Sequence, residues 1–265
     1  MNFKVLYLIA IALPLTACLA QENNVIEEKA ENSKSLNINK DSLTVVEFYR
    51  AHMGNNQPSR STGTVGKGTL INGKLPPFYG PNFQYFDVNS YLSSRAFTHH
   101  ITRDIILEAY QSLEKELPSR YFYLMELSSE EGGKLYPHKT HQNGLSVDFM
   151  MPKLKDGKDY YGLDTLGVNH YLLKFNDHGE YDKDPSITID FDVMARHLLI
   201  LNDKAEEKGY KIAKVIIKIE YKDKLFATEY GKKLKSSGIY LVQNLSPLVN
   251  SIHDEHYHVD FEKIK

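Results

Sequence analysis

The spacing of hydrophobic side chains predicts three amphipathic helices in this chain. Residues 98–117 place apolar side chains at helical intervals with charged residues between them, and Pro118 follows directly. Because a proline cannot continue a helix, we expect this helix to end before Pro118. Residues 189–210 repeat the same spacing, and residues 223–237 do so over a shorter length.

Shorter apolar or alternating runs predict β-strands. These runs are residues 43–50, 121–129, 144–152, 213–221 and 255–262. Residues 57–82 and 153–186 carry many turn residues, so we expect loops, short strands and hairpins there. Together the elements predict an α+β fold with a mixed, mainly antiparallel sheet and helices packed on one side.

The N-terminus is typical of a secretory signal. Lys4 supplies a positive charge, and the apolar run from Val5 to Leu15 is too short to span a bilayer. Cys18 follows a Leu-Thr-Ala stretch that resembles the bacterial lipobox, in which the cysteine becomes the lipidated first residue of the mature protein. An ordinary cleaved signal followed by an incidental cysteine is the alternative. We predict residues 1–17 as a lipoprotein-type signal peptide and Cys18 as the lipidation site.

Two further regions follow the signal. Residues 18–42 are rich in Glu, Asn, Lys and Ser and nearly free of large apolar side chains, so we predict a flexible tether. Residues 43–265 are about the size of one large domain. Signal, tether and domain predict a lipoprotein of the periplasm or cell envelope, which a lipid on Cys18 anchors to a membrane.

Composition excludes several classes of function for the domain. Cys18 is the only cysteine, so residues 43–265 contain no disulfide, no thiolate nucleophile and no thiolate zinc ligand. The formal net charge is -2 and no basic run occurs, which argues against a nucleic-acid partner. A metal site in this domain must therefore use nitrogen and oxygen ligands.

Histidine is concentrated in two short segments of the chain. They are PHKTHQNGLSVDFMMP, residues 137–152, and HDEHYHVDF, residues 253–261, which together hold five of the 11 histidines. Chance alone gives roughly half an expected His-x-His pair in such a chain, so the pair in the second segment needs independent support. The first segment provides it.

The alternation of a β-strand brings candidate metal ligands together. Residues i and i+2 of a strand point to the same face, so His256 and His258 would project into one site. A glycine turn between His141 and Asp148 could bring both of these side chains to one centre. Two histidines and one carboxylate leave a fourth tetrahedral position for water, which is the arrangement of a catalytic zinc site.

Two further observations favour catalysis at this site. If His258 binds the metal, His256 lies about one water molecule away and can take the proton as that water attacks. A lone carboxylate in an apolar strand is costly to bury unless it is paired or metal-bound, so Asp148 needs such a partner. A Ser-His-Asp hydrolase is the main enzymatic rival, but no Gly-x-Ser-x-Gly turn occurs and Ser146 lies on a strand. His197 lies among apolar residues and is interpreted as structural.

The two histidine segments together resemble the penicillin-insensitive murein endopeptidases. This family belongs to a wider group of peptidoglycan peptidases with lysostaphin-type and D-alanyl-D-alanine carboxypeptidase metal sites. Gly132-Gly133 before the first segment also fits, and the likeness extends more loosely from GTLINGKLPPFYGPNF to the C-terminus. The chain departs from the family where tryptophans usually precede the last histidines, because SPLVNSI stands there. The resemblance implies a fold like that of the Hedgehog and DD-peptidase domains.

The resemblance also implies roles for individual residues. One zinc ion per domain would be bound by His141, Asp148 and His258, with His138 as a further candidate ligand. His256 would be the catalytic base. His253 would lie beside it and orient the water, the ligands or the substrate.

The expected activity is the zinc-dependent hydrolysis of peptidoglycan stem peptides by a zinc-activated water. An endopeptidase that cuts D-alanyl crosslinks is the leading hypothesis. A D-alanyl-D-alanine carboxypeptidase is one alternative, and a non-catalytic envelope lipoprotein that binds zinc or peptidoglycan is another. The presence of His256 beside the three expected ligands argues against the non-catalytic alternative, because a binding protein needs no base.

Overall fold

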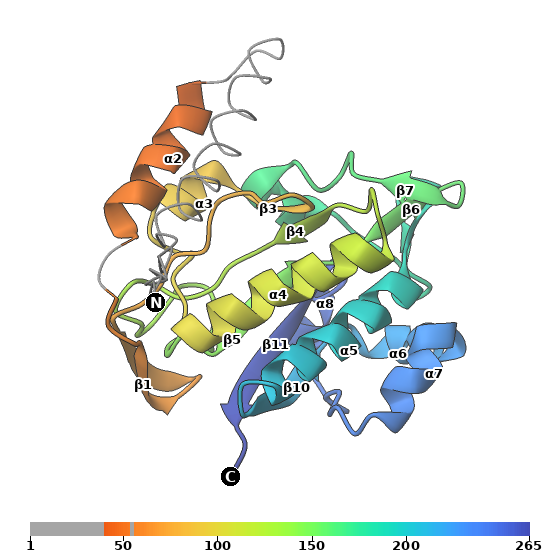
Figure 1. The fold of residues 1–265 in the computed structure, drawn as a ribbon. Helices are drawn as coiled ribbons and strands as arrows, with labels where there is room; N and C mark the ends of the chain where they lie inside the picture. Colours follow the sequence, from red (N-terminus) through yellow and green to blue (C-terminus); the bar gives the residue numbers. More distant parts are fainter. Residues whose placement is uncertain (1–39, 54–55) are drawn as a thin grey trace, which may run out of the picture. The chain divides into compact units, whose positions relative to one another are not determined.

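The computed structural model describes residues 40–53 and 56–265 (Figure 1). The chain divides into two compact units, Met1–Leu43 and Thr44–Lys265, and the elements below belong to the second unit apart from the first turn of one helix. The predicted signal peptide, Cys18 and nearly all of the predicted tether lie outside the described residues. Within the described residues, none of the helices has the length and apolar character needed to cross a membrane.

A five-stranded sheet carries much of the hydrophobic core. Its strands, in spatial order, are β10 (Tyr210–Ile216), β11 (His256–Lys263), β5 (Ser146–Met150), β4 (Phe122–Leu124) and β3 (Phe83–Tyr85). The first four strands pair in antiparallel order, whereas β4 and β3 are parallel. The predicted α+β fold with a mixed, mainly antiparallel sheet is therefore confirmed.

Two long helices, α4 (His100–Glu116) and α5 (Phe191–Glu206), lie side by side across one face of this sheet (Figure 1). Each begins at a side chain that accepts a hydrogen bond from a first-turn amide: His99 for α4 and Asp190 for α5. The α4 helix ends just before Pro118, as the sequence predicts. Both helices bury apolar residues spaced by three or four positions, which is the amphipathic pattern seen in the sequence.

The two turn-rich segments form short strands and hairpins, as expected. In the first, β1 (Arg60–Thr64) pairs with β2 (Lys67–Ile71). The second contributes most of a four-stranded sheet in the spatial order β7 (Lys158–Tyr160), β6 (Lys153–Lys155), β9 (Asp184–Ile189) and β8 (Glu180–Tyr181). Short helices complete the unit: α3 (Val88–Leu92), η2 (Gly167–Leu172), η3 (Ile219–Tyr221), α6 (Lys222–Ala227), α7 (Glu229–Ser236) and α8 (Pro247–Ser251).

The strand predicted for residues 43–50 is wrong, because this segment belongs to helix α2 (Lys40–His52). Its β-branched residues favour a strand when taken alone. Val45 is buried, Phe48 packs against the core, and the His52 ring contacts the Phe48 ring at a centroid distance of 4.1 Å. Positions 45, 48 and 52 share one face of a helix, so packing of that face overrides the local preference.

Three other predicted elements differ from the sequence prediction in their bounds. The strand predicted over residues 213–221 is β10, which ends at Ile216, and Ile219–Tyr221 form η3. The helix predicted over residues 223–237 is divided at Thr228, whose extended backbone ends α6 and whose hydroxyl caps α7. The strand predicted over residues 121–129 is regular only in β4. Beyond β4 the chain leaves the ladder, and Ser128 pairs instead with Phe97 through an isolated bridge.

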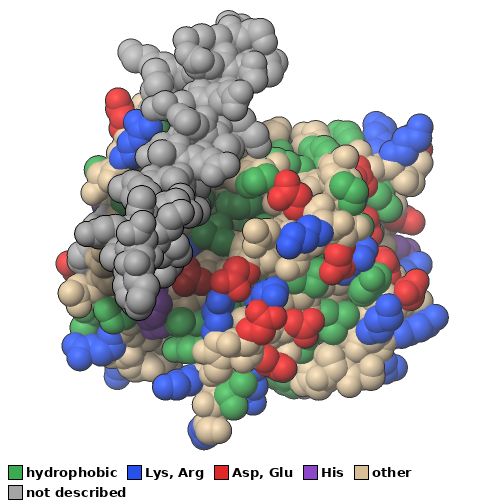
Figure 2. All heavy atoms as spheres, in the orientation of Figure 1, with side chains coloured by type: hydrophobic (Ala, Val, Ile, Leu, Met, Phe, Trp, Pro, Cys, Tyr) green, Lys and Arg blue, Asp and Glu red, His purple; other side chains and the backbone are tan. Residues whose placement is uncertain are grey.

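Charged side chains of both signs are interspersed on the face of the molecule drawn in Figure 2. Lys and Arg alternate there with Asp and Glu and do not gather into a single basic patch. This distribution agrees with the near-neutral composition. The expected absence of a nucleic-acid partner stays a prediction.

His197 lies in the core between the helices and the sheet, consistent with a structural role. Its side chain on α5 stacks against Tyr110 at 5.3 Å between ring centroids and lies edge-on to Phe149 at 4.8 Å. The Tyr257 hydroxyl forms a hydrogen bond with His197 Nδ1. Burial lowers the pKa of His197 to about 3, because a charged imidazole would lose its hydration in this apolar cage.

This buried histidine predicts a loss of stability in acid. The folded-state pKa lies below the ordinary value of about 6.5, so the unfolded chain takes up a proton that the folded chain excludes. The free energy of unfolding should therefore fall as the pH drops from about 6.5 towards 3, by up to about 1.4 kcal/mol per pH unit from this group. The free energy of unfolding, measured with urea at pH 7, 6 and 5, should fall less steeply with decreasing pH in His197→Phe than in the wild type. An equal dependence of this free energy on pH in both proteins would contradict the prediction. His178→Phe, the same change at an exposed histidine, is the control.

Candidate metal centre

Strands β5 and β11 place the candidate residues on one face of the sheet. They pair in antiparallel order with His258 opposite Asp148 and Tyr257 opposite Phe149. Because side chains alternate along a strand, His256, His258 and Asp148 point away from helices α4 and α5, whereas Tyr257 and Phe149 point towards them. The predicted common face of His256 and His258 is therefore confirmed.

His141 reaches the same place from the loop before β5. Its backbone has a left-handed φ of 64°, and Gly144 reverses the chain with a φ of 77°. A side chain at position 144 would meet the His99 backbone nitrogen at 2.6 Å, so glycine is required there. The fully buried His141 ring donates its Nδ1 proton to the Leu127 carbonyl at 2.6 Å and turns Nε2 towards β5.

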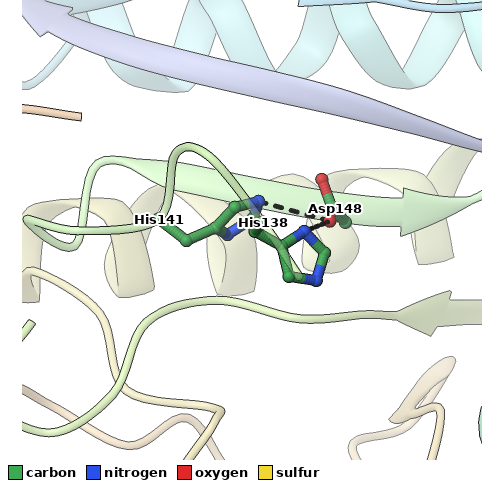
Figure 3. A group of neighbouring side chains, drawn as sticks. All are labelled: His138, His141 and Asp148. Carbon is green, nitrogen blue, oxygen red and sulfur yellow. Dashed lines mark ion pairs between the residues drawn. The ribbon is translucent and has the colours of Figure 1, made fainter. Parts of the chain in front are cut away.

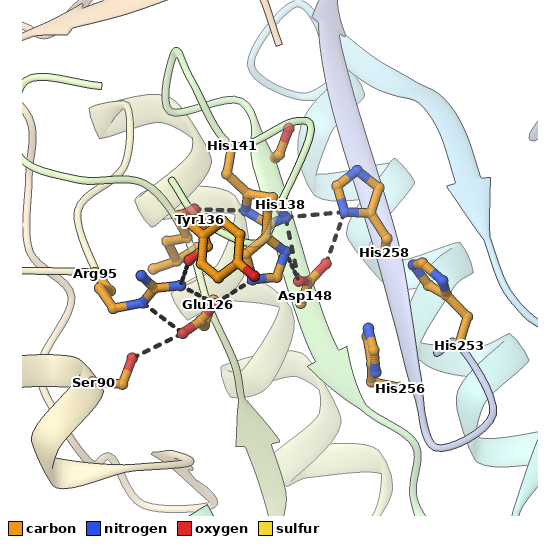
Figure 4. Close-up of polar contacts among 12 residues, drawn as sticks. Ser90, Arg95, Glu126, Tyr136, His138, His141, Asp148, His253, His256 and His258 are labelled. Atoms are coloured by element: carbon orange, nitrogen blue, oxygen red, sulfur yellow. Dashed lines mark hydrogen bonds and ion pairs between the residues drawn. The ribbon is translucent and has the colours of Figure 1, made fainter. Parts of the chain in front are cut away.

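Three candidate ligand side chains converge at this point: Figure 3 shows His141 and Asp148, and Figure 4 shows His258 beside them. His141 Nε2 lies 3.2 Å from Asp148 Oδ2 and 3.1 Å from His258 Nδ1. His258 Nδ1 lies 2.7 Å from Asp148 Oδ1. All three side chains are buried, so the structure brings together the three residues that the sequence predicts as ligands.

These separations are compatible with a tetrahedral zinc ion. Zinc bonds of about 2.0 to 2.1 Å hold neighbouring ligand atoms about 3.3 Å apart. The two separations from His141 Nε2, 3.2 and 3.1 Å, are close to this value. The 2.7 Å pair would have to open by about half an ångström to reach it. The donor set of two imidazoles and one carboxylate also suits zinc.

The nitrogen on the far side of each ligand imidazole is held by an acceptor. His141 uses the Leu127 carbonyl, and His258 Nε2 lies 2.7 Å from Asp260 Oδ1. Such bonds fix the orientation of a metal-binding histidine and the tautomer in which the inward nitrogen is free. Both imidazoles are therefore oriented as a metal-binding pair would have to be.

His138 lies beside the three converging side chains, and Glu126 holds the ring nitrogen that faces away from them. Its Nδ1 is 3.5 Å from Asp148 Oδ2, and its Nε2 bonds to Glu126. Arg95 holds Glu126 with two hydrogen bonds of 2.6 and 2.7 Å (Figure 4). Burial raises the pKa of Glu126, but the hydrogen bonds from His138 and Arg95 outweigh burial and lower the pKa to about 2. His138 therefore points its free nitrogen at the centre from a rigid support.

His256 and His253 form the edge of the site next to His258. His256 Nδ1 lies 2.7 Å from Glu255 Oε1, which leaves Nε2 without that partner. His253 Nδ1 donates to the Val249 carbonyl at 2.6 Å, and its ring lies 4.8 Å from the His256 ring. Burial lowers the pKa of His253 to about 3, and the neighbouring His256 makes a smaller contribution in the same direction. Both histidines predicted as catalytic thus lie together beside the predicted ligands.

Ser146 is not arranged as a nucleophile. Its hydroxyl donates to Asp260 Oδ1 at 2.6 Å, the same oxygen that receives the proton of His258 Nε2. The serine therefore holds the partner of a ligand candidate. This contact gives further reason to reject the rival Ser-His-Asp reading of the sequence.

The electrostatics of the site favour a bound cation. Burial raises the pKa of Asp148, but His141 and His258 outweigh burial and keep the pKa well below its usual range. Burial lowers the pKa of His258, yet Asp260 and Asp148 raise it to about 10. The two carboxylates thus stabilise a His258 imidazolium with a proton on each nitrogen, and a divalent cation that binds Nδ1 would replace the inward proton.

Five residues of the site were not predicted from the sequence, and Asp260 beside His258 is one of them. Glu126 and Arg95 support His138, and His170 and Glu255 adjoin His256. Glu126 lies in the apolar run 121–129, which carries the same signal of a lone carboxylate that identified Asp148. Glu255 is within the second histidine segment, but His170 offers no comparable signal.

No model of a known protein family matches the chain, and no curated protein matches it. The chemistry of the site therefore has to be inferred from its residues and from the resemblance of its two histidine segments.

Proposed function

We propose that this protein is a zinc-dependent hydrolase of peptidoglycan stem peptides, and specifically an endopeptidase that cuts D-alanyl crosslinks. The convergence of His141 Nε2, Asp148 and His258 Nδ1 within 3.2 Å carries the proposal. The outward nitrogens of His141 and His258 are held by the Leu127 carbonyl and by Asp260. Histidines that bind zinc are usually held in the same way through their second nitrogen. Three protein ligands leave a position open for water, as catalytic zinc sites do.

In this proposal, His141, Asp148 and His258 hold one zinc ion. When bound, zinc supplies the Lewis-acid chemistry that activates a water molecule and polarises a peptide carbonyl. His256 Nε2 takes a proton from the attacking water and delivers it to the leaving amine nitrogen as the C–N bond breaks. Water adds as hydroxyl to the carbonyl carbon, and no covalent link to the protein forms. His253 and His138 orient the water, the ligands or the substrate from either side.

A cavity of about 300 Å³ adjoins this centre and could receive part of the substrate. Glu126, which supports His138, lines it together with Arg95, Val168 and Tyr171. The Tyr171 ring, which lines the cavity, lies 6.5 Å from the ring of the proposed base His256. The volume of the cavity is at the lower end of the range for small-molecule pockets, so it could receive only part of a stem peptide.

The location in the cell follows from the N-terminal segment and is part of the same proposal. A secretory signal over residues 1–17, a lipid on Cys18 and a tether over residues 18–42 would hold the domain near the cell wall. The substrate class is proposed from the resemblance to murein endopeptidases and from this placement in the periplasm or cell envelope.

The test is metal content and hydrolysis measured on the same purified full chain. We expect one zinc per molecule by mass spectrometry and the loss of crosslinked muropeptide dimers, with monomers as products. Incubation with a chelator should stop the reaction, because the residues alone cannot supply the Lewis acid. Zinc added back after removal of the chelator should restore the activity.

Other outcomes would change the proposal in defined ways. Release of terminal D-alanine without cleavage of dimers would replace the endopeptidase by a carboxypeptidase. Bound zinc without cleavage of dimers or of terminal D-alanine would contradict hydrolysis of stem peptides. A protein without zinc after growth in zinc-containing medium would contradict the metal site.

A further inference from the structure

A second group of buried side chains lies directly behind the proposed base. His170, on the short helix η2, is fully buried, although it comes from the turn-rich segment 153–186. Its ring is edge-on to Phe86 at 5.3 Å between centroids, which fixes the plane of the imidazole. His170 Nδ1 lies 2.7 Å from Glu255 Oε1. The two residues are 85 positions apart in the chain.

Glu255 is shared between two imidazoles. Its Oε1 accepts from His170 Nδ1 and from His256 Nδ1, both at 2.7 Å. An ionised carboxylate can only accept hydrogen bonds, so each imidazole must donate from Nδ1. Burial raises the pKa of Glu255, but His170 and His256 outweigh burial and keep the pKa below its usual range. The carboxylate is therefore ionised and both bonds are charge-assisted.

Hydrogen bonding explains this group better than a second metal ion does. His170, Glu255 and His256 each place a donor atom close enough to share a cation. Each imidazole nitrogen lies 2.7 Å from Glu255 Oε1, which is an ordinary hydrogen-bond distance. In addition, both nitrogens address the same oxygen, as expected for two donors and one acceptor.

The hydrogen bond from His170 helps to fix the position of the Glu255 carboxylate. Glu255 Oε2 is buried and has no hydrogen-bond partner within the described part of the chain. Its position therefore depends on the two bonds to Oε1. Loss of the bond from His170 would leave the carboxylate held by His256 alone, and it could turn its unpartnered oxygen towards any other donor.

We infer that His170 is a positioning residue for His256: through Glu255 it fixes the tautomer that carries its proton on Nδ1 and leaves Nε2 free. This inference rests on the proposed function, because it concerns the base of that reaction. It makes the segment 153–186 part of the active site, since η2 brings His170 behind His256. His170 would not touch the substrate. It would act by holding Glu255, and Glu255 in turn would hold His256 as an aspartate holds the histidine of a serine protease.

The tautomer can be measured without relying on activity. Long-range ¹H–¹⁵N correlation spectra of the metal-free full chain, labelled at histidine, distinguish protonated from unprotonated imidazole nitrogens. We expect His256, assigned by comparison with His256→Ala, to carry its proton on Nδ1. This pattern should change in His170→Leu and persist in His178→Leu, a matched change at an exposed histidine of the same segment. A proton on Nε2 and none on Nδ1 in the wild type would overturn the inference, whatever the variants do.

Kinetics on the zinc-loaded protein separate a positioning role from a structural one. We expect His170→Leu to keep one bound zinc and to lower kcat by about tenfold to a hundredfold, with KM close to that of the wild type. His170→Asn should recover much of the loss, because its amide NH₂ can donate to Glu255 from a similar place. Circular dichroism and thermal unfolding show whether each variant is folded.

The possible results are distinguishable from failure of the proposed function. A wild type that does not hydrolyse stem peptides contradicts the proposed function. The tautomer measurement still tests the hydrogen bonds from His170 and His256 to Glu255. A folded His170→Leu with the kcat and the His256 spectrum of His178→Leu would overturn the inference. If His170→Leu does not fold, Glu255→Ala removes the acceptor oxygen that the two imidazoles share. Unchanged kcat and His256 signals in that variant would overturn the inference as well.

Discussion

Replacing Asp148 with asparagine is expected to remove the bound zinc and, with it, all measurable hydrolysis. Asp148 is the anionic member of the predicted ligand set, and its two oxygens lie 2.7 Å from His258 Nδ1 and 3.2 Å from His141 Nε2. Asparagine has nearly the same shape but no charge, so the site loses the attraction that offsets burial of a dication. We expect zinc affinity to fall by more than about a hundredfold, since even loss of a residue behind a ligand costs about ten- to a hundredfold.

The measurement for Asp148→Asn is zinc content after dialysis, together with cleavage of crosslinked muropeptide dimers. Asp182→Asn is the matched control, because it makes the same chemical change at an exposed aspartate. The control should keep both zinc and activity. Wild-type zinc content in Asp148→Asn would remove Asp148 from the ligand set and leave its burial beside two histidines to be explained by hydrogen bonding alone.

The face of the sheet that carries the candidate ligands could be predicted because it depends on a local property. Alternation along residues 255–262 is sufficient to place His256 and His258 on one face. Asp148 could be connected to that face because a lone carboxylate in an apolar strand needs a partner. The structure meets this need by pairing Asp148 with His258 in the register of β5 and β11.

The residues behind the ligands could not be predicted because their partners are distant in the chain. Arg95 and Glu126 are 31 positions apart, and His170 and Glu255 are 85 apart. A sequence segment with Glu255 between histidines does not reveal that one of its partners comes from a short helix in a turn-rich segment. Pairs of this kind become visible only when the packing of loops is known.

The fold itself shows the same division between local and long-range information. The amphipathic spacing that predicts α4 and α5 is carried by each helix separately. For α2 the local β-branched residues favour a strand, and the packing of Val45 and Phe48 against the core decides for a helix. Elements whose state is decided by neighbours far away in the sequence are the ones that sequence patterns misassign.

Replacing His256 with alanine is expected to abolish most hydrolysis while the zinc stays bound. In the proposed mechanism His256 moves a proton but binds no metal, and its removal leaves the contacts among His141, Asp148 and His258 intact. General acid–base catalysis by one side chain is typically worth about 10² to 10⁴ in rate, so kcat/KM should fall by that factor. This combination of full metal content and lost turnover differs from the result expected for Asp148→Asn.

The experiment measures zinc and dimer cleavage for His256→Ala, the wild type and the exposed-site control His178→Ala. Added imidazole should restore part of the activity of His256→Ala, because the deleted ring leaves space beside Glu255 and His253 for a free base. Loss of zinc in His256→Ala would instead make His256 a ligand and leave the base unassigned. A variant with full zinc and full activity would contradict the role of His256 as the base. It would also contradict the role of His170 and Glu255 in positioning that base.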